Sequence, residues 1–113
     1  MTADAPTQDA LHGFTIFRHE VRIGAVELLS TEEVPMECAT LAAELSAQPS
    51  VPPLSPDQLE RSLHHRHLPA LDETAVIDYD QSEQRITAFD PARLDTLINA
   101  VQDLTESLEG NRF

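Results

Sequence analysis

Six side chains that can donate, accept or bind stand close together near the middle of the chain. The stretch reads Arg61-Ser62-Leu63-His64-His65-Arg66-His67. A guanidinium fork can hold a phosphate or pair with N7 and O6 of guanine, so Arg61 and Arg66 are candidates for nucleic-acid contact. Leu59 and Leu63 are expected to face a core, which leaves the polar positions at 61, 62, 65 and 66 on other faces of the same helix.

The three histidines of this stretch suggest a metal site, because imidazole nitrogen is a common ligand of zinc. His64 and His67 could share a site at i, i+3, but the spacing of His65 does not bring a third ring to the same face. We therefore expect no metal. We expect His67 to be a core histidine beside Leu63 and Leu71, and the other two to be surface donors.

Signatures of catalysis are missing from the sequence. The chain has three glycines, too few for a glycine-rich phosphate loop, and it has no nucleophile elbow. Carboxylates are abundant, but a uniformly acidic surface brings pairs of them together by chance. We expect a protein that is not an enzyme and that uses no cofactor.

The 113-residue chain has a formal net charge of −13, from 20 acidic and seven basic residues. All seven basic residues are Arg. DNA-binding domains usually carry a basic patch, so the total charge argues at first against nucleic acid. However, arginine without lysine among many carboxylates is also the composition of proteins that work in molar salt, where charge repulsion is strongly screened. We expect a salt-adapted protein, and the alternative is an ordinary acidic protein that avoids DNA.

The chain shows no signal for a membrane span, for secretion or for a disulfide. No apolar run approaches the roughly 20 residues that span a bilayer, and the first residues lack the basic and apolar regions of a signal peptide. Cys38 has no second cysteine to pair with. Its helical spacing with Leu41, Ala42 and Leu45 indicates a small core residue rather than a reactive thiol. We expect a cytoplasmic protein.

Apolar periodicity and turn residues divide the chain into helices and one β-hairpin. The first predicted helix has Phe14, Phe17, Val21, Ala25 and Leu28 on one face, and a short extended piece at 34–36 and a helix over 38–45 follow it. After a proline-rich loop at 49–56, a third helix starts with a Ser55 N-cap and a Gln58 capping box and runs to about residue 72. Strands at 75–79 and 85–89 come next, and a last helix runs from Asp90-Pro91 to Gly110. Pro69 should kink the third helix or start a new turn. This α+β order is that of a winged helix-turn-helix, in which a three-helix core carries a hairpin wing and offers the helix before it to the major groove.

The run from Ser62 to Leu71, followed by Ala75-Val76-Ile77-Asp78-Tyr79-Asp80, resembles an uncharacterised haloarchaeal winged-helix family. Its members carry a similar LxHxHLPxL…VxYD signature. The resemblance covers roughly residues 17 to 89 and implies a DNA-binding or regulator-like domain of a salt-adapted archaeon. The proline-rich loop departs from the family's tight turn. We expect a mobile lead at 1–12, a winged-helix domain at 13–89 and a dimerisation helix at 90–110.

The net charge is unevenly distributed along the chain. Residues 1–53, 54–71 and 72–113 carry −6, 0 and −7, so the acidic field is relieved over the helix that a winged helix would offer to DNA. Arg85, at the foot of the predicted wing, is a further candidate for phosphate or minor-groove contact. The candidate DNA-binding residues are Arg61, Ser62, His65, Arg66 and Arg85. The alternative is that Arg61 and Arg66 are solubilising groups paired with Glu60 and Asp57.

The last predicted helix carries apolar residues at heptad spacing. They are Leu94, Leu97, Val101, Leu104 and Leu108, with Ile98 beside them. This seam can pack on the first helix of the same chain, or it can pair with its copy in a second chain. We favour a homodimer, because a chain of this length has a limited core. Two recognition helices would then face DNA half-sites about one helical turn apart.

The sequence as a whole predicts a small transcriptional regulator that binds double-stranded DNA sequence-specifically as a homodimer. The alternative is a winged-helix module for protein interaction that does not bind DNA.

Overall fold

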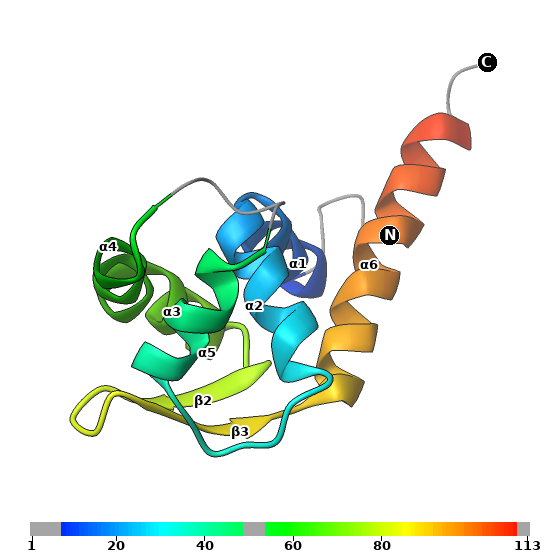
Figure 1. The fold of residues 1–113 in the computed structure, drawn as a ribbon. Helices are drawn as coiled ribbons and strands as arrows, with labels where there is room; N and C mark the ends of the chain where they lie inside the picture. The colour runs from blue at the N-terminus through cyan, green and yellow to red at the C-terminus, as the bar shows by residue number, and fades with distance from the viewer. Residues whose placement is uncertain (1–7, 49–53, 111–113) are drawn as a thin grey trace.

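Helices α1 to α5 lie on one side of a small antiparallel sheet, and a long C-terminal helix follows the last strand (Figure 1). The structure, a computed structural model, describes residues 8–48 and 54–110, with side chains to residue 107. Its elements are α1 (Gln8–Phe17), α2 (Glu20–Leu29), β1 (Met36–Glu37), α3 (Cys38–Ser46), α4 (Pro56–Ser62), the π-helical turn η1 (Leu63–His67), α5 (Leu68–Glu73), β2 (Ile77–Asp80), β3 (Arg85–Phe89) and α6 (Pro91–Gly110). The fold is of the predicted α+β class.

Strands β2 and β3 form a hairpin where the two β-like runs were predicted. A third short strand, β1, pairs with β3, and the strand order is β1-β3-β2 with every pair antiparallel. Met36 lies opposite Ile86, and Ile77 lies opposite Phe89. Buried and exposed residues alternate along β2, as expected for a strand with one face on a core.

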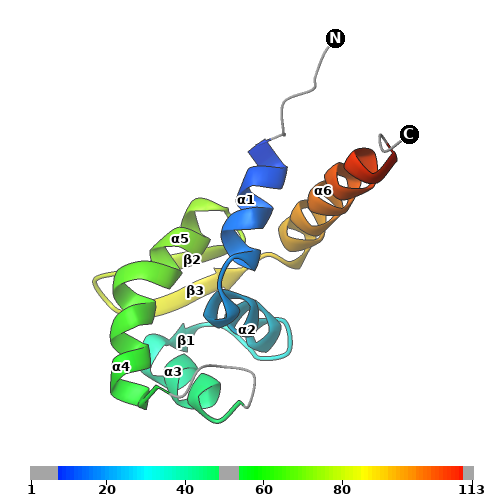
Figure 2. The same cartoon turned by 90° about the horizontal axis from the view of Figure 1, so that it is seen from above.

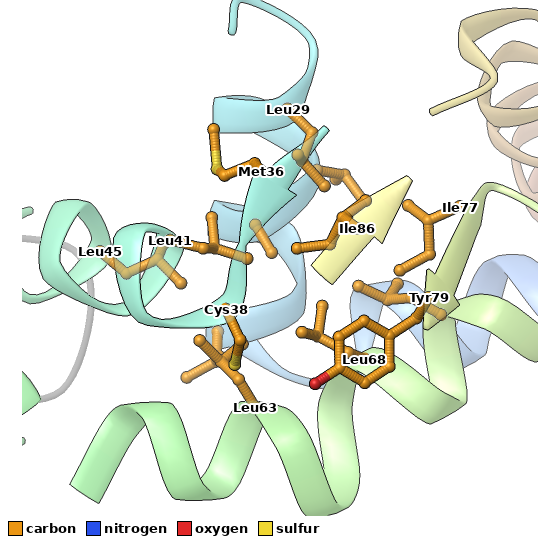
Figure 3. Packing of buried hydrophobic residues seen from close by; sticks show 14 of the residues in the cluster. Leu29, Met36, Cys38, Leu41, Leu45, Leu63, Leu68, Ile77, Tyr79 and Ile86 are labelled. Carbon is orange, nitrogen blue, oxygen red and sulfur yellow. The ribbon is translucent and has the colours of Figure 1, made fainter. Parts of the chain in front are cut away.

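One apolar core fills the space between the sheet and the helices (Figure 3). The α3 residues of this core are Cys38, Leu41, Ala42 and Leu45. They confirm the predicted face of that helix. Ile77, Tyr79 and Ile86 close the core from the sheet side.

The first predicted helix is in fact two helices. α1 ends at Phe17, α2 begins at Glu20, and His19 between them is extended (φ −133°, ψ 128°). This break shifts the helical phase, so Phe14 and Phe17 are 37% and 38% exposed. The buried residues of α1 are Ala10, Gly13 and Ile16. The prediction that Phe14 and Phe17 face the core is therefore wrong, whereas Val21 and Ala25 are buried as predicted.

The start of α1 also changes the predicted N-terminal boundary. Residues 8–12 belong to α1, and Ala10 is buried, so the expected mobile lead is wrong for this part. Residues 1–7 lie outside the described part of the chain, as do residues 49–53 of the predicted proline-rich loop.

Helices α4 and α5 join through η1 into one composite helix over residues 56–73. Ser55 and Gln58 form the predicted capping box at its start, with Pro56 in the first turn. The composite helix buries Leu59 and Leu63 against α3 and the core.

The irregularity expected near Pro69 is a π-turn that precedes it. The backbone N–H of Leu68 donates to the carbonyl of Leu63, five residues back, and Pro69 follows with no N–H to donate. The wider turn brings Leu68 onto the buried side together with His67 and Leu71. Leu68 is a core residue that was not predicted, because the expected buried positions of this helix, from Leu59 to Leu71, were spaced four residues apart.

The first half of α6 packs on α1. Leu97 is fully buried, and Gly13 of α1 lies against Leu97 and Val101. Leu94 packs on the core, while Ile98 and Leu104 are half-buried. The heptad seam thus begins as an intramolecular contact, and α6 then extends away from the rest of the fold (Figure 1). The side chain of Leu108 lies outside the described part.

Arg93 connects the start of α6 to two other elements. Its Nε donates to the carbonyl of Thr74 after α5 (3.0 Å), and its Nη1 pairs with Asp9 of α1 (2.9 Å). Nη2 lies 3.2 Å from Nδ1 of His12. Arg93 therefore holds α1, α5 and α6 together.

The order α2, β1, α3, composite helix, β2, β3 is compatible with a winged helix-turn-helix, with α1 and α6 added at the ends. Among the helices that the structure describes, none combines the length and the apolar character that a bilayer span requires.

We predict that Gly13→Ala destabilises the protein, although alanine normally stabilises a helix interior. A Cβ at this position would lie 3.0 Å from the carbonyl oxygen of Leu97 and would collide with Cγ2 of Val101. We expect the free energy of unfolding to fall by about 1 to 3 kcal/mol in urea denaturation followed by circular dichroism. Asn99→Ala, on the exposed face of α6, is the control. An unchanged or raised stability of Gly13→Ala would contradict the packing of α1 on α6.

Candidate nucleic-acid interface

The face of the composite helix next to the hairpin forms an open hollow. Its lining residues are Asp57, Glu60, Arg61, His64, His65 and Gln84. Arg61 and His65 are both exposed, as predicted from the helical pattern, and Gln84 belongs to the turn between β2 and β3. The structure therefore brings two of the candidate DNA-binding residues together with the hairpin.

The remaining candidates are more scattered. Ser62 is half-buried on the composite helix. Arg85, at the base of the hairpin, pairs loosely with Glu37 of β1 at 3.8 Å. Arg66 is exposed but does not line the hollow. Its charge instead acts on His19, between α1 and α2, and on Arg22 of α2. The five candidates thus do not form a single patch.

The hollow contains carboxylates, so this face is not free of acid. Asp57 is exposed and Glu60 is half-buried in its wall. Within the described part of the chain, however, neither of them forms an ion pair with Arg61 or Arg66. The alternative in which these two arginines are held by Glu60 and Asp57 is not observed there.

Two hydrogen bonds link residues that line the hollow to residues of the core. Nδ1 of His64 lies 2.6 Å from the hydroxyl oxygen of Tyr79, and the Cys38 thiol donates to the carbonyl of Glu60 at 3.6 Å. Burial raises the pKa of Cys38 to about 11, so its thiol stays protonated. Cys38 is therefore a core residue, as predicted, and the Tyr79 contact orients the ring of His64.

A second polar group lies where the composite helix meets α2. Arg22 is 7% exposed; its Nε donates to Nδ1 of His67 (3.0 Å) and its Nη1 donates to the carbonyl of Thr15 (2.8 Å). Thr15 stands in the last turn of α1, where carbonyls lack intrahelical partners and a cation is favourable. His67 is buried, as predicted.

The electrostatics of this group keep His67 neutral. Burial lowers the pKa of His67 to about 4, and the positive charges of Arg22, His19 and Arg66 act in the same direction. Because Nδ1 accepts from Arg22, the ring proton of His67 must be on Nε2. The His19 ring meets the His67 ring edge-on, with centroids 5.3 Å apart.

Sequence reasoning missed Arg22 as a buried residue. The signal was present, because Arg22, Ala25, Val26 and Leu29 stand at i, i+3, i+4 and i+7 and all four are buried. The prediction instead placed 14–28 on one continuous helix, and this gave the wrong phase. Among the described residues, no group of three His, Cys, Asp or Glu side chains is placed to hold a metal ion.

The fold and this surface define a small α+β domain with a helix and a hairpin exposed side by side. A model of a protein family described as a domain of unknown function, DUF7344, matches residues 14–87. The chain belongs to this family. Membership of an uncharacterised domain family is thus confirmed, while haloarchaeal origin remains a prediction. No curated protein and no solved structure matches the chain.

We predict that His67 makes stability depend on pH between about 6.5 and 4. The unfolded state binds a proton near 6.5 and the folded state near 4. Above pH 6.5 the ring is neutral in both states, so its burial is fully tolerated. As the pH falls towards 4, the unfolded state takes up a proton that the folded state does not bind, and the free energy of unfolding falls. The loss amounts to about 3 kcal/mol.

His67→Gln tests this dependence, because its amide oxygen can still accept from Arg22. In urea denaturation at pH 7 and pH 4.5, the wild type should lose more stability than His67→Gln. His65→Gln, on an exposed position, should behave like the wild type. Equal losses in the wild type and His67→Gln would show that the buried ring is not the cause.

Proposed function

We propose that this protein is a cytoplasmic, sequence-specific DNA-binding regulator with a winged helix-turn-helix fold. The composite helix would be the recognition helix, and the β2–β3 hairpin would be the wing. The observation that carries the proposal is that the exposed arginines of the composite helix have no carboxylate partner among the described residues.

This absence is informative because the chain is so acidic. With 20 acidic residues, an arginine that only adds solubility has many carboxylates within reach. Arg85 and Arg93 do pair, with Glu37 and Asp9. In the described part of the chain, the arginines with no carboxylate within 4 Å are Arg18, Arg22, Arg61 and Arg66. Guanidinium groups that form no ion pair remain available for an external anion, and a DNA phosphate or a guanine edge supplies the matching acceptors.

Neutral groups around Arg61 add hydrogen-bonding capacity that high salt does not screen. His65 is exposed on the same helix, and Gln81, Ser82 and Gln84 are exposed on the hairpin turn. Direct hydrogen bonds to base edges carry specificity, whereas phosphate contacts weaken as salt rises. This combination suits a regulator that works in concentrated salt, which is the environment that the composition suggests.

Arg61→Ala should reduce the affinity for a specific duplex by about 1 to 3 kcal/mol, because a guanidinium contact to a base edge is lost. Duplexes are first enriched from a random library by the wild-type protein in high KCl, and binding is then measured by gel shift. Gln102→Glu, on the exposed face of α6, lowers the net charge by the same single unit and is the control.

The control should bind like the wild type, and circular dichroism should show that both variants are folded. Failure to enrich any duplex, or an equal loss in Arg61→Ala and Gln102→Glu, would rule out DNA binding through this face.

We also propose that the protein works as a homodimer through α6 and the exposed side of α1. Leu94 and Leu97 pack on the core of their own chain, but the apolar seam continues through Val101 and Leu104, which are only partly buried. On α1, Leu11 is 47% exposed and Phe14 is 37% exposed. A second copy would cover both sets, because an isologous contact presents the same apolar seam from each chain.

Leu104→Glu should convert the dimer into a monomer, because a carboxylate would enter an apolar contact. Sedimentation equilibrium should give twice the 12.5 kDa of one chain for the wild type and a single chain for this variant. Thr105→Glu, one residue further on and exposed, should remain dimeric. A monomeric wild type would exclude the homodimer.

The second candidate function is a protein-interaction module without DNA binding. The exposed apolar residues Leu11, Phe14 and Phe17 of α1 favour it, because they lie outside the proposed DNA-binding face. This second function is indicated if the random library yields no duplex although the protein recovered from the experiment is intact and folded.

A further inference from the structure

Three arginines and two histidines gather where the turn between α1 and α2 meets the composite helix. Arg18 and His19 come from this turn, Arg22 from the first turns of α2, and Arg66 and His67 from η1. The turn lies beside the composite helix in Figure 2. We call these five residues the junction cluster.

The distances hold the centre of the junction cluster tightly together. Arg22 Nε lies 3.0 Å from His67 Nδ1, and the rings of His19 and His67 are 5.3 Å apart. Arg66 and Arg18 both act on the pKa of Arg22 and of His19, which they lower after the larger effect of burial. The charges of Arg18 and Arg66 therefore reach both Arg22 and His19.

No ion pair among the described residues neutralises the arginines of the junction cluster. The charges that act on the pKa of His19, Arg22 and His67 are all positive. Within the described residues, none of the three arginines lies within 4 Å of a carboxylate. Among the described residues, the arginines of the junction cluster therefore form no ion pair, although the chain has 20 acidic residues.

Arg22 is the part of the junction cluster that is hardest to explain as structure alone. A guanidinium has five N–H donors, and Arg22 uses one at His67 and one at Thr15 among the described residues. The residue is buried, at 7% exposure. A buried cation with neutral partners and spare donors is costly unless an anion completes it.

We propose that the junction cluster is a binding site for a phosphate-type oxyanion, with Arg22 at its floor and the exposed Arg18 and Arg66 at its rim. Guanidinium groups bind tetrahedral oxyanions through paired, charge-assisted N–H···O bonds. His19 adds a further donor at the rim, while His67 holds Arg22 in place. The site does not include Arg61 or the hollow beside the hairpin.

Two sources can supply the oxyanion. One is the phosphate backbone of a duplex bound to the composite helix, in which case the junction cluster rests on the proposed DNA-binding function. The other is a free phosphate-bearing small molecule. Both present the same acceptor oxygens, so inorganic phosphate tests the site itself and DNA tests the source.

The first experiment measures the midpoint of thermal unfolding in rising sodium phosphate, with sodium chloride at equal ionic strength as the reference. Binding to the folded state should raise the midpoint with the logarithm of phosphate concentration. The Nε–Hε resonance of Arg22 should shift at the same time in NMR spectra of the wild type.

Arg66→Gln and Arg61→Gln form the matched pair, because both remove an exposed arginine from the same composite helix. Arg66→Gln should lose most of the response to phosphate, and Arg61→Gln should keep it. Arg18→Gln should behave like Arg66→Gln and provides a second variant on a different element. Equal responses in phosphate and chloride, or in Arg66→Gln and Arg61→Gln, would overturn the proposal.

The second experiment assigns the source with a duplex of arbitrary sequence. If the backbone of DNA is the ligand, Arg66→Gln should lower the slope of log affinity against log salt by about one. If the ligand is a free anion, Arg66→Gln should bind this duplex like the wild type while still failing to respond to phosphate. A wild-type protein that responds to phosphate but enriches no duplex would retain the site and exclude the proposed DNA-binding function.

Discussion

The five-residue turn at the centre of the composite helix decides which of its side chains reach the core and which reach the surface. A regular helix advances 100° per residue, so residues spaced by four drift steadily around its axis. The extra residue in η1 corrects this drift: Leu63 and Leu68 share the Leu68 N–H to Leu63 carbonyl bond, and both are buried. His67 stays inside and Arg66 outside as a result. This orientation of the helix sets which of its side chains meet the sheet and α3, and which belong to the junction cluster.

The acidic surface and the arginines show how little a total charge says about a binding face. The chain carries −13, yet the described structure separates its arginines into two groups. Arg85 and Arg93 are paired with carboxylates, and Arg93 also joins α1 to α6. The others lie on or beside the composite helix without such partners in the described part. Solvent screening makes the distant carboxylates matter less than these local contacts, because screened fields fall off within about 10 Å.

The two added helices complete the core rather than lying apart from it. Leu97 of α6 is fully buried, and Gly13 lets α1 approach the backbone of α6 closely, because a Cβ there would meet the Leu97 carbonyl. The seam of α6 is therefore shared between an intramolecular contact and a surface that continues along the same helix. The first half of α6 is thus used within the chain, while Val101 and Leu104 in its second half stay only partly covered.

Sequence by itself determined the elements whose signals are local: the capping box at Ser55, the hairpin, the α3 face and the start of α6. Capping and turn signals depend on residues a few positions apart, so a single sequence contains them. Tertiary structure decided the break at His19 and the partners of the buried Arg22. The Arg22 contact joins two residues 45 positions apart, and contacts of this kind override the periodicity of any one helix.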